Sequence, residues 1–451
     1  MKKISFLLSI ILAISSCKQD NQFSLTIVSN LNTKDTIVFR EFITDKVIAE
    51  FLLDSNVNNY TIPIEYPTAG VLECTAAEEN YLFSLTSGKR CSVLISKDGK
   101  ISSDNICDSL LNYLHTSNNE FINGVSNYIF STVDLDSVVQ IFEDFRIERE
   151  NVIINHFNEL TNEEVNLLQF HNSARIYSFL FYFGRIAKQL DLNSHYYDFS
   201  ENIDQNNTWI KTLPDILLYK YEIEFYKLNG SINSVESFIE YISTETQEDD
   251  LSDFLVSRYL NMVLEMPSNW KLHEFMINPE VLRDILDQEK DNPYFEIIKK
   301  SSDSYFKSQK GEIAYNFKAV DKYGKEVQLD DFKGKVVLID SWATWCGPCL
   351  NHRPAILKLA EKYKDNPSVV VLMISVDKNK TNWLNYLNKE DSDNYGMDLN
   401  IPNGMNTEFG NSFNIKTIPK YILIDKNGMI YNSDIPEPSI MLEQMIEKLI
   451  H

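Results

Sequence analysis

An uninterrupted apolar strand that runs almost directly into a pair of cysteines is the sequence feature that most restricts the fold. Val336–Ile339 reads Val-Val-Leu-Ile, and Trp-Ala-Thr-Trp-Cys-Gly-Pro-Cys follows over Trp342–Cys349. A short apolar run of this kind is typical of a strand that is buried on both faces in a parallel sheet. A helical pattern comes next, with Ile356, Leu359 and Tyr363 on one face. The cysteines are therefore expected at a strand-to-helix turn of an α/β domain.

The same mixed texture continues to the C-terminus. Val369–Val376 is a second apolar strand, and Trp383–Leu387 is a helical stretch followed by a polar loop. Tyr421–Ile424 then leads through an Asp-Lys-Asn-Gly turn into Met429–Tyr431, and Ile440–Ile450 has the pattern of a closing helix. Strands that alternate with helices predict a compact layered α/β domain over residues 309–451.

Two other textures precede this domain. Residues 18–106 hold short runs of β-branched and aromatic residues between polar turns, which predict a small antiparallel sheet or sandwich. Residues 107–308 instead show apolar stripes at helical spacing, of which Leu135, Val138 and Phe142 form one. A chain of 451 residues is also too long for a single core. We therefore expect a multidomain protein with an irregular α-helical domain in the middle.

The N-terminus, residues 1–17, carries the pattern of an export signal. Lys2 and Lys3 precede an apolar run from Ile4 to Ile14, and Ser-Ser-Cys17 follows. The run is shorter than the ~20 apolar residues of a spanning helix, and no later stretch is long and apolar enough to cross a membrane. The end of the segment resembles the lipobox of bacterial lipoproteins, which implies that Cys17 is lipidated and anchors the protein in the cell envelope, facing the periplasm. An ordinary cleaved signal with a chance cysteine is the alternative.

The charge of the chain argues against some classes of partner. The formal net charge is −23 at pH 7, and hydrophobic residues make up 43% of the sequence. Nucleic acids and anionic lipid surfaces bind basic faces, so neither is an expected partner. The apolar fraction is ample for packed cores, which argues against bulk disorder.

Three kinds of chemistry can use a cysteine pair of this spacing. Zinc would need four ligands, and the other thiols (Cys74, Cys91 and Cys107) are far apart, so no metal site is expected. An inert disulfide would close so small a loop that it would remove little entropy from the unfolded chain. Redox exchange fits better. A helix N-terminus favours the Cys346 thiolate, and Cys349, one turn on, can attack a mixed disulfide at Cys346.

These residues resemble a known family. The segment Gly334–Gly428 is similar to the thioredoxin-fold domain of membrane-tethered, extracytoplasmic reductases related to TlpA and ResA. Five blocks carry the similarity in the family's order: Phe332–Asp340, Trp342–Cys349, Ile374–Asp377, Thr417–Pro419 and Ile424–Gly428. The resemblance implies a lipid-anchored thiol–disulfide oxidoreductase that reduces protein disulfides.

The resemblance also implies roles for particular residues. Cys346 would be the attacking cysteine and Cys349 the resolving one. Pro419 matches the family's cis-proline opposite the cysteines, which leaves the neighbouring backbone free to pair with an extended client segment; a trans proline at a strand start is the alternative. Trp345 and Ile418 are the expected client contacts, with core packing as the lesser alternative for Trp345.

Asp340 occupies the position of thioredoxin's buried aspartate. Desolvation is expected to raise its pKa, so that it can accept the proton of Cys349 during resolution. The alternative is an exposed strand-end aspartate or a helix cap. Two positions depart from the family pattern: His352 stands where many relatives carry a glutamate, and Lys420 where a threonine often follows the proline. His352 is either a proton shuttle on the helix face of Cys349 or a solvated surface histidine.

The expected partners follow from this chemistry. They are disulfide-bonded client proteins and a membrane thiol–electron transporter as reductant, and no bound cofactor is implied because no flavin, haem or nucleotide motif appears. Two alternatives stay open. One is a thiol peroxidase, since residues 314–332 also resemble the entry strands of peroxiredoxin-like proteins, and the other is a binding lipoprotein with an accessory redox domain. Cys74 and Cys91 are expected on neighbouring strands, where a disulfide can join them.

Overall fold

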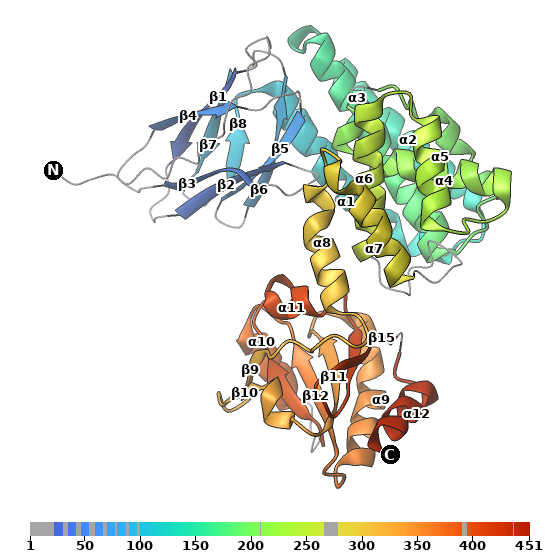
Figure 1. Cartoon of the computed structure of the whole chain (residues 1–451). Coiled ribbons are helices and arrows are strands. Elements are labelled where there is room, and N and C mark those ends of the chain that lie inside the picture. The colour runs from blue at the N-terminus through green and yellow to red at the C-terminus, as the bar shows by residue number, and fades with distance from the viewer. Residues whose placement is uncertain are drawn as a thin grey trace. The chain divides into compact units, whose positions relative to one another are not determined.

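The computed structural model of the chain describes residues 22–29, 35–41, 47–53, 59–65, 70–76, 79–86, 90–96, 100–207, 209–265, 278–389, 395–435 and 437–451. Cys17 and the rest of the predicted export signal lie outside these residues. The chain forms two compact units, Met1–Leu217 and Leu218–His451. Along the chain, strands come first, helices follow, and a mixed α/β part ends it (Figure 1). This order agrees with the multidomain organisation expected from the sequence, while the boundaries at residues 106 and 308 stay predictions.

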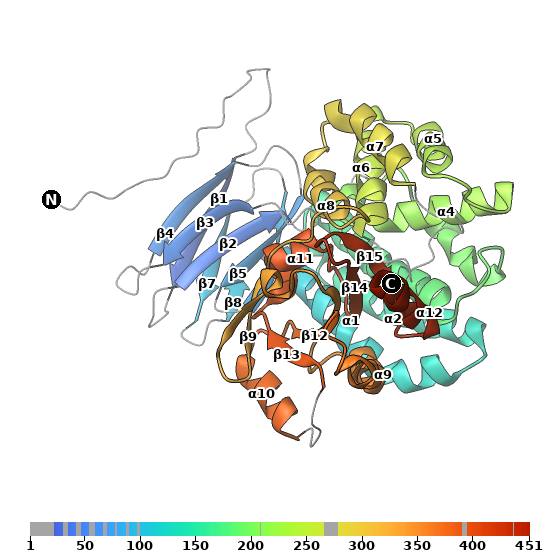
Figure 2. The same cartoon turned by 60° about the horizontal axis from the view of Figure 1, so that its bottom comes forward.

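Two four-stranded sheets form the first part of the chain, with strand orders β4-β1-β7-β8 and β3-β2-β5-β6 (Figure 2). The strands are β1 (Gln22–Ser29), β2 (Asp35–Glu41), β3 (Val47–Leu53), β4 (Asn59–Glu65), β5 (Gly70–Ala76), β6 (Glu79–Leu85), β7 (Arg90–Ile95) and β8 (Ile101–Ser103). Alternate residues of β2, Ile37 and Phe39, are buried, as the two-residue period of a strand requires. One core combines Phe39 and Phe83 of one sheet with Val93 of the other, so the sheets form a sandwich.

The sheet that contains β1 differs from an all-antiparallel one. β1 pairs antiparallel with β4 but parallel with β7, with Leu25 opposite Cys91. Parallel neighbours cannot be joined by a tight hairpin, and here the intervening strands β2 to β6 provide the long connection. β7 and β8 form an antiparallel hairpin, in which the Ser96 N–H donates to the Lys100 carbonyl oxygen at 2.9 Å. Residues 97–99 of its turn lie outside the described residues.

The predicted disulfide between Cys74 and Cys91 is wrong. Cys74 lies on β5, whose partners in the sheet are β2 and β6, whereas Cys91 lies on β7 of the other sheet. Cys74 is a buried free thiol, and burial raises the pKa of this thiol above its usual range. The sequence spacing could not show this, because the chain places the two strands in different sheets.

Long helices follow the sandwich in the first unit. They are α1 (Ile106–Ser131), α2 (Leu135–Ile154) and α3 (Asn162–Tyr182), with short helical turns η1 (Phe157–Glu159), η2 (Phe183–Ala187), η3 (His195–Asn202) and η4 (Ile210–Thr212). Helix α3 begins with a capping box, in which Thr161 and Glu164 satisfy each other's backbone N–H groups. The stripe predicted on α2 is confirmed at Val138 and Phe142, which are fully buried. The buried Asp108 carboxylate on α1 accepts hydrogen bonds from the Ser84 N–H and hydroxyl groups, which ties α1 to β6.

Five more helices and the 3₁₀ turn η5 precede the C-terminal part. They are α4 (Asp215–Asn229), α5 (Val235–Glu245), α6 (Asp249–Glu265), α7 (Pro279–Gln288), η5 (Glu289–Asp291) and α8 (Glu296–Lys307). Leu255, Tyr259 and Val263 form the buried stripe of α6. Residues 266–277, which follow this helix, lie outside the described residues.

The C-terminal part is built on a seven-stranded sheet of order β10-β9-β13-β12-β11-β14-β15. Its strands are β9 (Lys318–Asp321), β10 (Glu326–Gln328), β11 (Val336–Trp342), β12 (Val369–Ser375), β13 (Met397–Asn400), β14 (Lys420–Ile424) and β15 (Ile430–Ile435). Its helices are η6 (Leu329–Phe332), α9 (Gly347–Tyr363), α10 (Lys380–Lys389), η7 (Gly404–Asn406), α11 (Glu408–Ser412) and α12 (Ile440–Ile450). Every residue of β11 is buried, which explains its continuous apolar sequence. Helices α9 and α12 share one face of the sheet, because the Tyr363 hydroxyl donates to Glu447 at 2.6 Å.

The polar loop expected after α10 contains a strand and short helical segments that the sequence did not indicate. Strand β13 pairs parallel with β12, and the short helix α11 follows it. Half of β13 is polar, since it reads Met-Asp-Leu-Asn, and its Asn400 is nevertheless fully buried. The side-chain NH2 group of Asn400 donates to the backbone carbonyl and hydroxyl oxygens of Ser375, a compensation that a residue pattern cannot reveal.

Candidate active site around the cysteine pair

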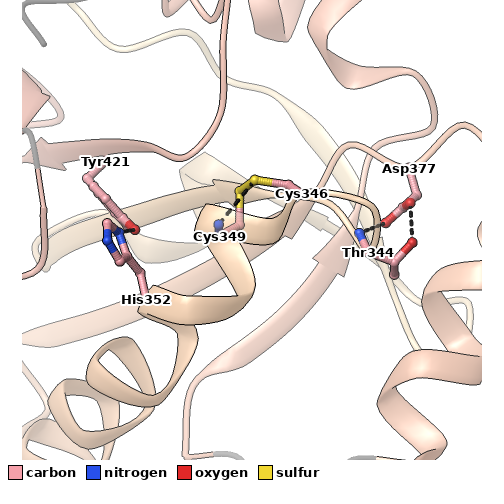
Figure 3. Close-up of a disulfide and its surroundings, with 6 residues drawn as sticks. All are labelled: Thr344, Cys346, Cys349, His352, Asp377 and Tyr421. Carbon is pink, nitrogen blue, oxygen red and sulfur yellow. Dashed lines mark hydrogen bonds between the residues drawn. A yellow bond between two sulfur atoms is a disulfide. The ribbon is translucent and has the colours of Figure 1, made fainter. Parts of the chain in front are cut away.

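The cysteine pair lies where β11 passes into α9. Cys346 caps the N-terminus of α9 and is joined by a disulfide to Cys349, with a Cα–Cα distance of 5.3 Å (Figure 3). The Cys349 N–H donates to the Cys346 sulfur at 3.2 Å. Cys346 and Cys349 are only 5% and 3% exposed, whereas the neighbouring Trp345 is 66% exposed. The site therefore places two sheltered sulfurs beside a flat apolar surface.

The start of α9 provides a positive environment for the Cys346 sulfur. The first N–H groups of a helix have no partner within the helix, and the helix dipole adds a partial positive charge there. Pro348 takes a first-turn position, where its missing N–H removes no helical hydrogen bond. The first turn carries no acidic residue that would oppose a thiolate. This local structure favours the Cys346 thiolate once the disulfide is reduced.

A buried carboxylate fixes the loop that leads into the cysteines. Asp377 follows the end of β12 and accepts hydrogen bonds from the Thr344 N–H at 3.0 Å and the Thr344 hydroxyl at 2.7 Å (Figure 3). The Ser375 hydroxyl also donates to Asp377, at 2.8 Å. Ile374–Asp377 was expected to match the family, but this contact was not predicted. Two positions 33 residues apart meet only because β11 and β12 are neighbours.

The peptide bond between Ile418 and Pro419 is cis, as the resemblance implied. Ile418 is partly buried and packs against the core of the C-terminal part. The segment before it is attached to the end of α6. Asn414, in the left-handed conformation at φ 49°, donates from its side-chain amide to the Leu264 carbonyl oxygen at 3.1 Å. Lys416 pairs with Glu265 at 3.5 Å.

Asp340 is buried on β11, with 4% of its surface exposed, so the reading as an exposed strand-end residue is excluded. Burial raises its pKa from 3.8 to about 7, while Arg353 opposes this rise and Asp398 adds to it. A carboxyl group with this pKa exchanges a proton near neutral pH, which is the property expected of a proton acceptor in the site.

His352 is directed at Tyr421 in the neighbouring strand β14. The His352 Nδ1 and the Tyr421 hydroxyl are 3.0 Å apart, and the two rings are stacked (Figure 3). Burial raises the pKa of Tyr421, and the charges of Asp340 and Glu437 raise it further. His352 is therefore not a fully solvated surface residue. The departure at Lys420 places a largely buried amine beside the cis-proline. Desolvation lowers the pKa of this amine, and its partner is Asp434 at 3.6 Å.

A buried ion pair that the sequence did not indicate lies next to this site. Arg353 on α9 donates to Asp398 on β13 at 2.9 Å, and both side chains are buried. A charged residue inside the helical stripe that also contains Ile356 was the one available indication for Arg353. Asp398 gave no such indication, because β13 itself was not predicted.

The described part of the chain has neither a cluster of metal ligands nor a helix that could span a membrane. Within it, no cluster of three or more histidine, cysteine, aspartate or glutamate side chains is arranged to hold a metal ion. Across the same residues, no helix has both the length and the apolar character needed to cross a membrane.

Comparisons with known proteins match about a third of the chain. The model of the Redoxin family matches residues 309–444. Thiol-disulfide oxidoreductase ResA of Bacillus thuringiensis (strain Al Hakam) is 30% identical over 144 residues, which are 32% of this chain and 80% of the relative. Thioredoxin-like protein YneN of Bacillus subtilis (strain 168) is 31% identical over 147 residues, 31% of this chain and 79% of the relative.

Solved structures are also similar to part of the chain. The thioredoxin domain of a thiol-disulfide oxidoreductase from Bacteroides vulgatus is 26% identical, covers 32% of this chain and 99% of that chain, and has a TM-score of 0.29. The Redoxin match and the identity to ResA show that the C-terminal part is a thioredoxin-fold domain. Through this thioredoxin-fold domain, the chain belongs to the family of ResA-like thiol–disulfide oxidoreductases.

Proposed function

We propose that this oxidoreductase reduces disulfide bonds of client proteins outside the cytoplasm. The observation that carries the proposal is the position of Cys346, whose sulfur accepts a backbone N–H at the N-terminus of α9 beside the exposed Trp345. This arrangement stabilises a nucleophilic thiolate next to a surface that an apolar client segment can contact.

The first step is attack on the client. The Cys346 thiolate attacks one sulfur of a client disulfide, a new bond forms between Cys346 and the client, and the second client sulfur leaves as a thiolate that takes a proton from water. Trp345 and Ile418 are the proposed client contacts, and Pro419 keeps the backbone beside the cysteines open for an extended segment.

The second step resolves the mixed disulfide. Cys349 gives its thiol proton to the Asp340 carboxylate and attacks Cys346, which forms the Cys346–Cys349 disulfide and releases the client as a thiolate. Two electrons have then passed to the client. A dithiol donor, proposed to be a membrane thiol–electron transporter, returns the pair to the dithiol form. His352 and Tyr421 are the proposed route by which the proton of Asp340 reaches solvent, which is supported by their 3.0 Å contact.

Two substrates test whether the protein reduces protein disulfides or peroxides. The full chain, supplied with a dithiol, should accelerate insulin reduction, and Cys346→Ser should abolish the acceleration. Peroxide consumption under the same conditions should stay at the level without protein. Peroxide turnover that exceeds insulin reduction would favour the thiol peroxidase alternative instead.

We also propose that the protein is a lipoprotein of the cell envelope, anchored through Cys17. The support is the sequence pattern, since this residue lies outside the described structure. Labelled fatty acid should enter the parent protein and not Cys17→Ala in cells. Equal labelling of the two proteins would contradict the anchor.

The chain N-terminal to residue 309 is proposed to be a β-rich domain and a helical domain. A binding role for these domains is the alternative in which the redox domain is an accessory. Capture of one client by both the parent and Cys346→Ser, with equal retention after reduction, would favour that alternative.

A further inference from the structure

Four side chains from four neighbouring strands form a row beneath the cysteine helix. In the register of the sheet, Asp398 of β13 is opposite Met373 of β12, Met373 is opposite Asp340 of β11, and Asp340 is opposite Tyr421 of β14. Residues opposite each other on paired strands project from the same face, and neighbouring strands lie about 4.8 Å apart. The row therefore places Asp340 between an uncharged thioether and a phenol, with the second carboxylate two strands away.

Helix α9 crosses this row and places consecutive residues on its two ends. His352 contacts Tyr421, and Arg353 reaches the other end of the row. The Arg353 guanidinium donates to the Met373 sulfur at 3.6 Å and to the Asp398 carboxylate at 2.9 Å. A guanidinium that spans these two contacts lies over the strand between the two aspartates.

Trp342 on β11 packs against the guanidinium of Arg353. The Arg353 Cζ lies 4.4 Å from the centre of the Trp342 ring, a cation–π contact. Trp342 comes two residues after Asp340 on the same strand, so both project toward α9. Arg353 is only 3% exposed, and solvent screens the charges of this group weakly.

Charged and titratable groups lie near Asp340 on three elements. Helix α9 contributes Arg353, and His352 through its contact with Tyr421; β13 contributes Asp398, and β14 contributes Tyr421, while the neighbour on β12, Met373, is neutral. Arg353 lowers the pKa of Asp340 and Asp398 raises it. The two members of one ion pair thus act on Asp340 in opposite directions.

We propose that Arg353 and Asp398 are positioning residues that set the proton affinity of Asp340 from opposite sides, the guanidinium favouring its carboxylate and the second carboxylate favouring its acid form. The inference rests on the proposed function, in which Asp340 accepts the Cys349 proton. These two groups would keep the Asp340 carboxyl able to exchange a proton near neutral pH.

The test compares three variants of the full chain: Arg353→Met, Asp398→Asn and the double variant. The readout is the titration midpoint of Asp340, followed by carboxyl ¹³C resonances in aspartate-labelled oxidised protein and assigned with Asp340→Asn. Arg353→Met should raise the midpoint by about one pH unit and Asp398→Asn should lower it by about as much, because each removes one charge of opposite sign. The double variant should lie near the parent.

A matched control removes a charge from the same helix at the surface. Lys362 on α9 is half-exposed and pairs with Glu443, so Lys362→Met should leave the midpoint of Asp340 in place. Arg353→Lys, which keeps the charge, should move the midpoint less than Arg353→Met. Midpoints of Arg353→Met and Asp398→Asn that shift in the same direction, or that stay at the parent value, would overturn the proposal.

The test also gives a result if Arg353→Met does not fold, or if Asp340 is not the proton acceptor. Arg353→Met leaves the buried Asp398 unpaired, so it can fail to fold; Asp398→Asn then decides alone, since a lowered midpoint supports the proposal and an unchanged one overturns it. If Asp340→Asn resolves mixed disulfides at the parent rate, the proposed role of Asp340 fails, and the titration still measures whether the ion pair controls its charge.

Discussion

Asp340 and Trp345 lie five positions apart in the sequence, and their environments are opposite. Asp340 is 4% exposed and Trp345 is 66% exposed. Burial of a carboxyl group disfavours its charged form, whereas an exposed indole next to a reactive sulfur is available to a client. Substitution of Asp340 is therefore expected to change stability, and substitution of Trp345 is expected to change client affinity.

Asp340→Asn is expected to stabilise the protein at high pH. The native carboxyl, with a pKa raised from 3.8 to about 7, keeps a proton that the unfolded chain releases between these values. The unfolding free energy of the parent therefore falls as pH rises through this window, and the full loss is present above pH 7. The variant should exceed the parent by at most about 4 kcal/mol at pH 8 and by less than about 1 kcal/mol at pH 4. Denaturant titrations at both pH values check this, and an advantage that is equal at both would contradict it.

Trp345→Ala should weaken client binding without unfolding the protein. Loss of one exposed aromatic contact costs on the order of 1 kcal/mol, so KM for a protein client should rise about fivefold while kcat changes little. The control is Tyr323→Ala, another exposed aromatic, which lies between β9 and β10 at the far edge of the sheet. Unchanged KM in Trp345→Ala, or an equal rise in the control, would argue against the client contact.

At the scale of residues, the motif blocks predicted the positions of some site residues but not the contacts between distant ones. The positions of Cys346, Cys349 and the cis-proline followed from short segments whose spacing is characteristic. The contacts of Thr344 with Asp377 and of Arg353 with Asp398 join residues 33 and 45 positions apart. Such pairs depend on which strands become neighbours, and a single sequence does not record that.

At the scale of elements, the loop between β11 and α9 depends on a side chain from the next strand. Thr344→Val keeps the shape of the side chain but removes the hydroxyl donor to Asp377. The carboxylate keeps its bonds from the Thr344 N–H and Ser375, so the protein should lose about 1–2 kcal/mol of unfolding free energy. Thr381→Val, an exposed change on α10, is the control. Equal denaturation midpoints for the two variants would show that this bond does not stabilise the loop.

Elements with a regular pattern were predicted, and irregular ones were not. Strands β11 and β12 are long apolar runs, and α9 has both its proline and its apolar stripe, so their existence could be predicted from the sequence. β13 has four residues, two of them polar, and its burial depends on contacts made by other elements. The parallel pairing of β1 with β7 likewise depends on the order of strands in space.

At the scale of the whole molecule, the second compact unit includes more than the thioredoxin-fold domain. It begins at Leu218 and so contains helices α5 to α8. These helices contact the redox domain through the bond of Asn414 to Leu264, and through the Ser433 hydroxyl, which donates to the Ser308 carbonyl oxygen at 2.7 Å. The sequence indicated the change of texture near residue 308 but contained no sign of these contacts.

A fragment of residues 218–451 should therefore be more stable than one of residues 309–451. The shorter fragment loses the contacts of α6 and α8 and exposes the surface that they cover, so its melting temperature should be lower by several degrees. Thermal unfolding of both fragments, each oxidised at Cys346 and Cys349, makes the comparison. Equal melting temperatures would show that the helices do not support the redox domain.

The central claim is that Cys346 attacks client disulfides and Cys349 resolves the product. Its most direct test is to express Cys349→Ser and Cys346→Ser in cells and to separate the proteins on non-reducing gels after acid quenching. Cys349→Ser should accumulate adducts with other proteins that disappear on reduction, because attack continues while resolution is lost, and Cys346→Ser should form none. Adducts on Cys346→Ser and none on Cys349→Ser would contradict the account.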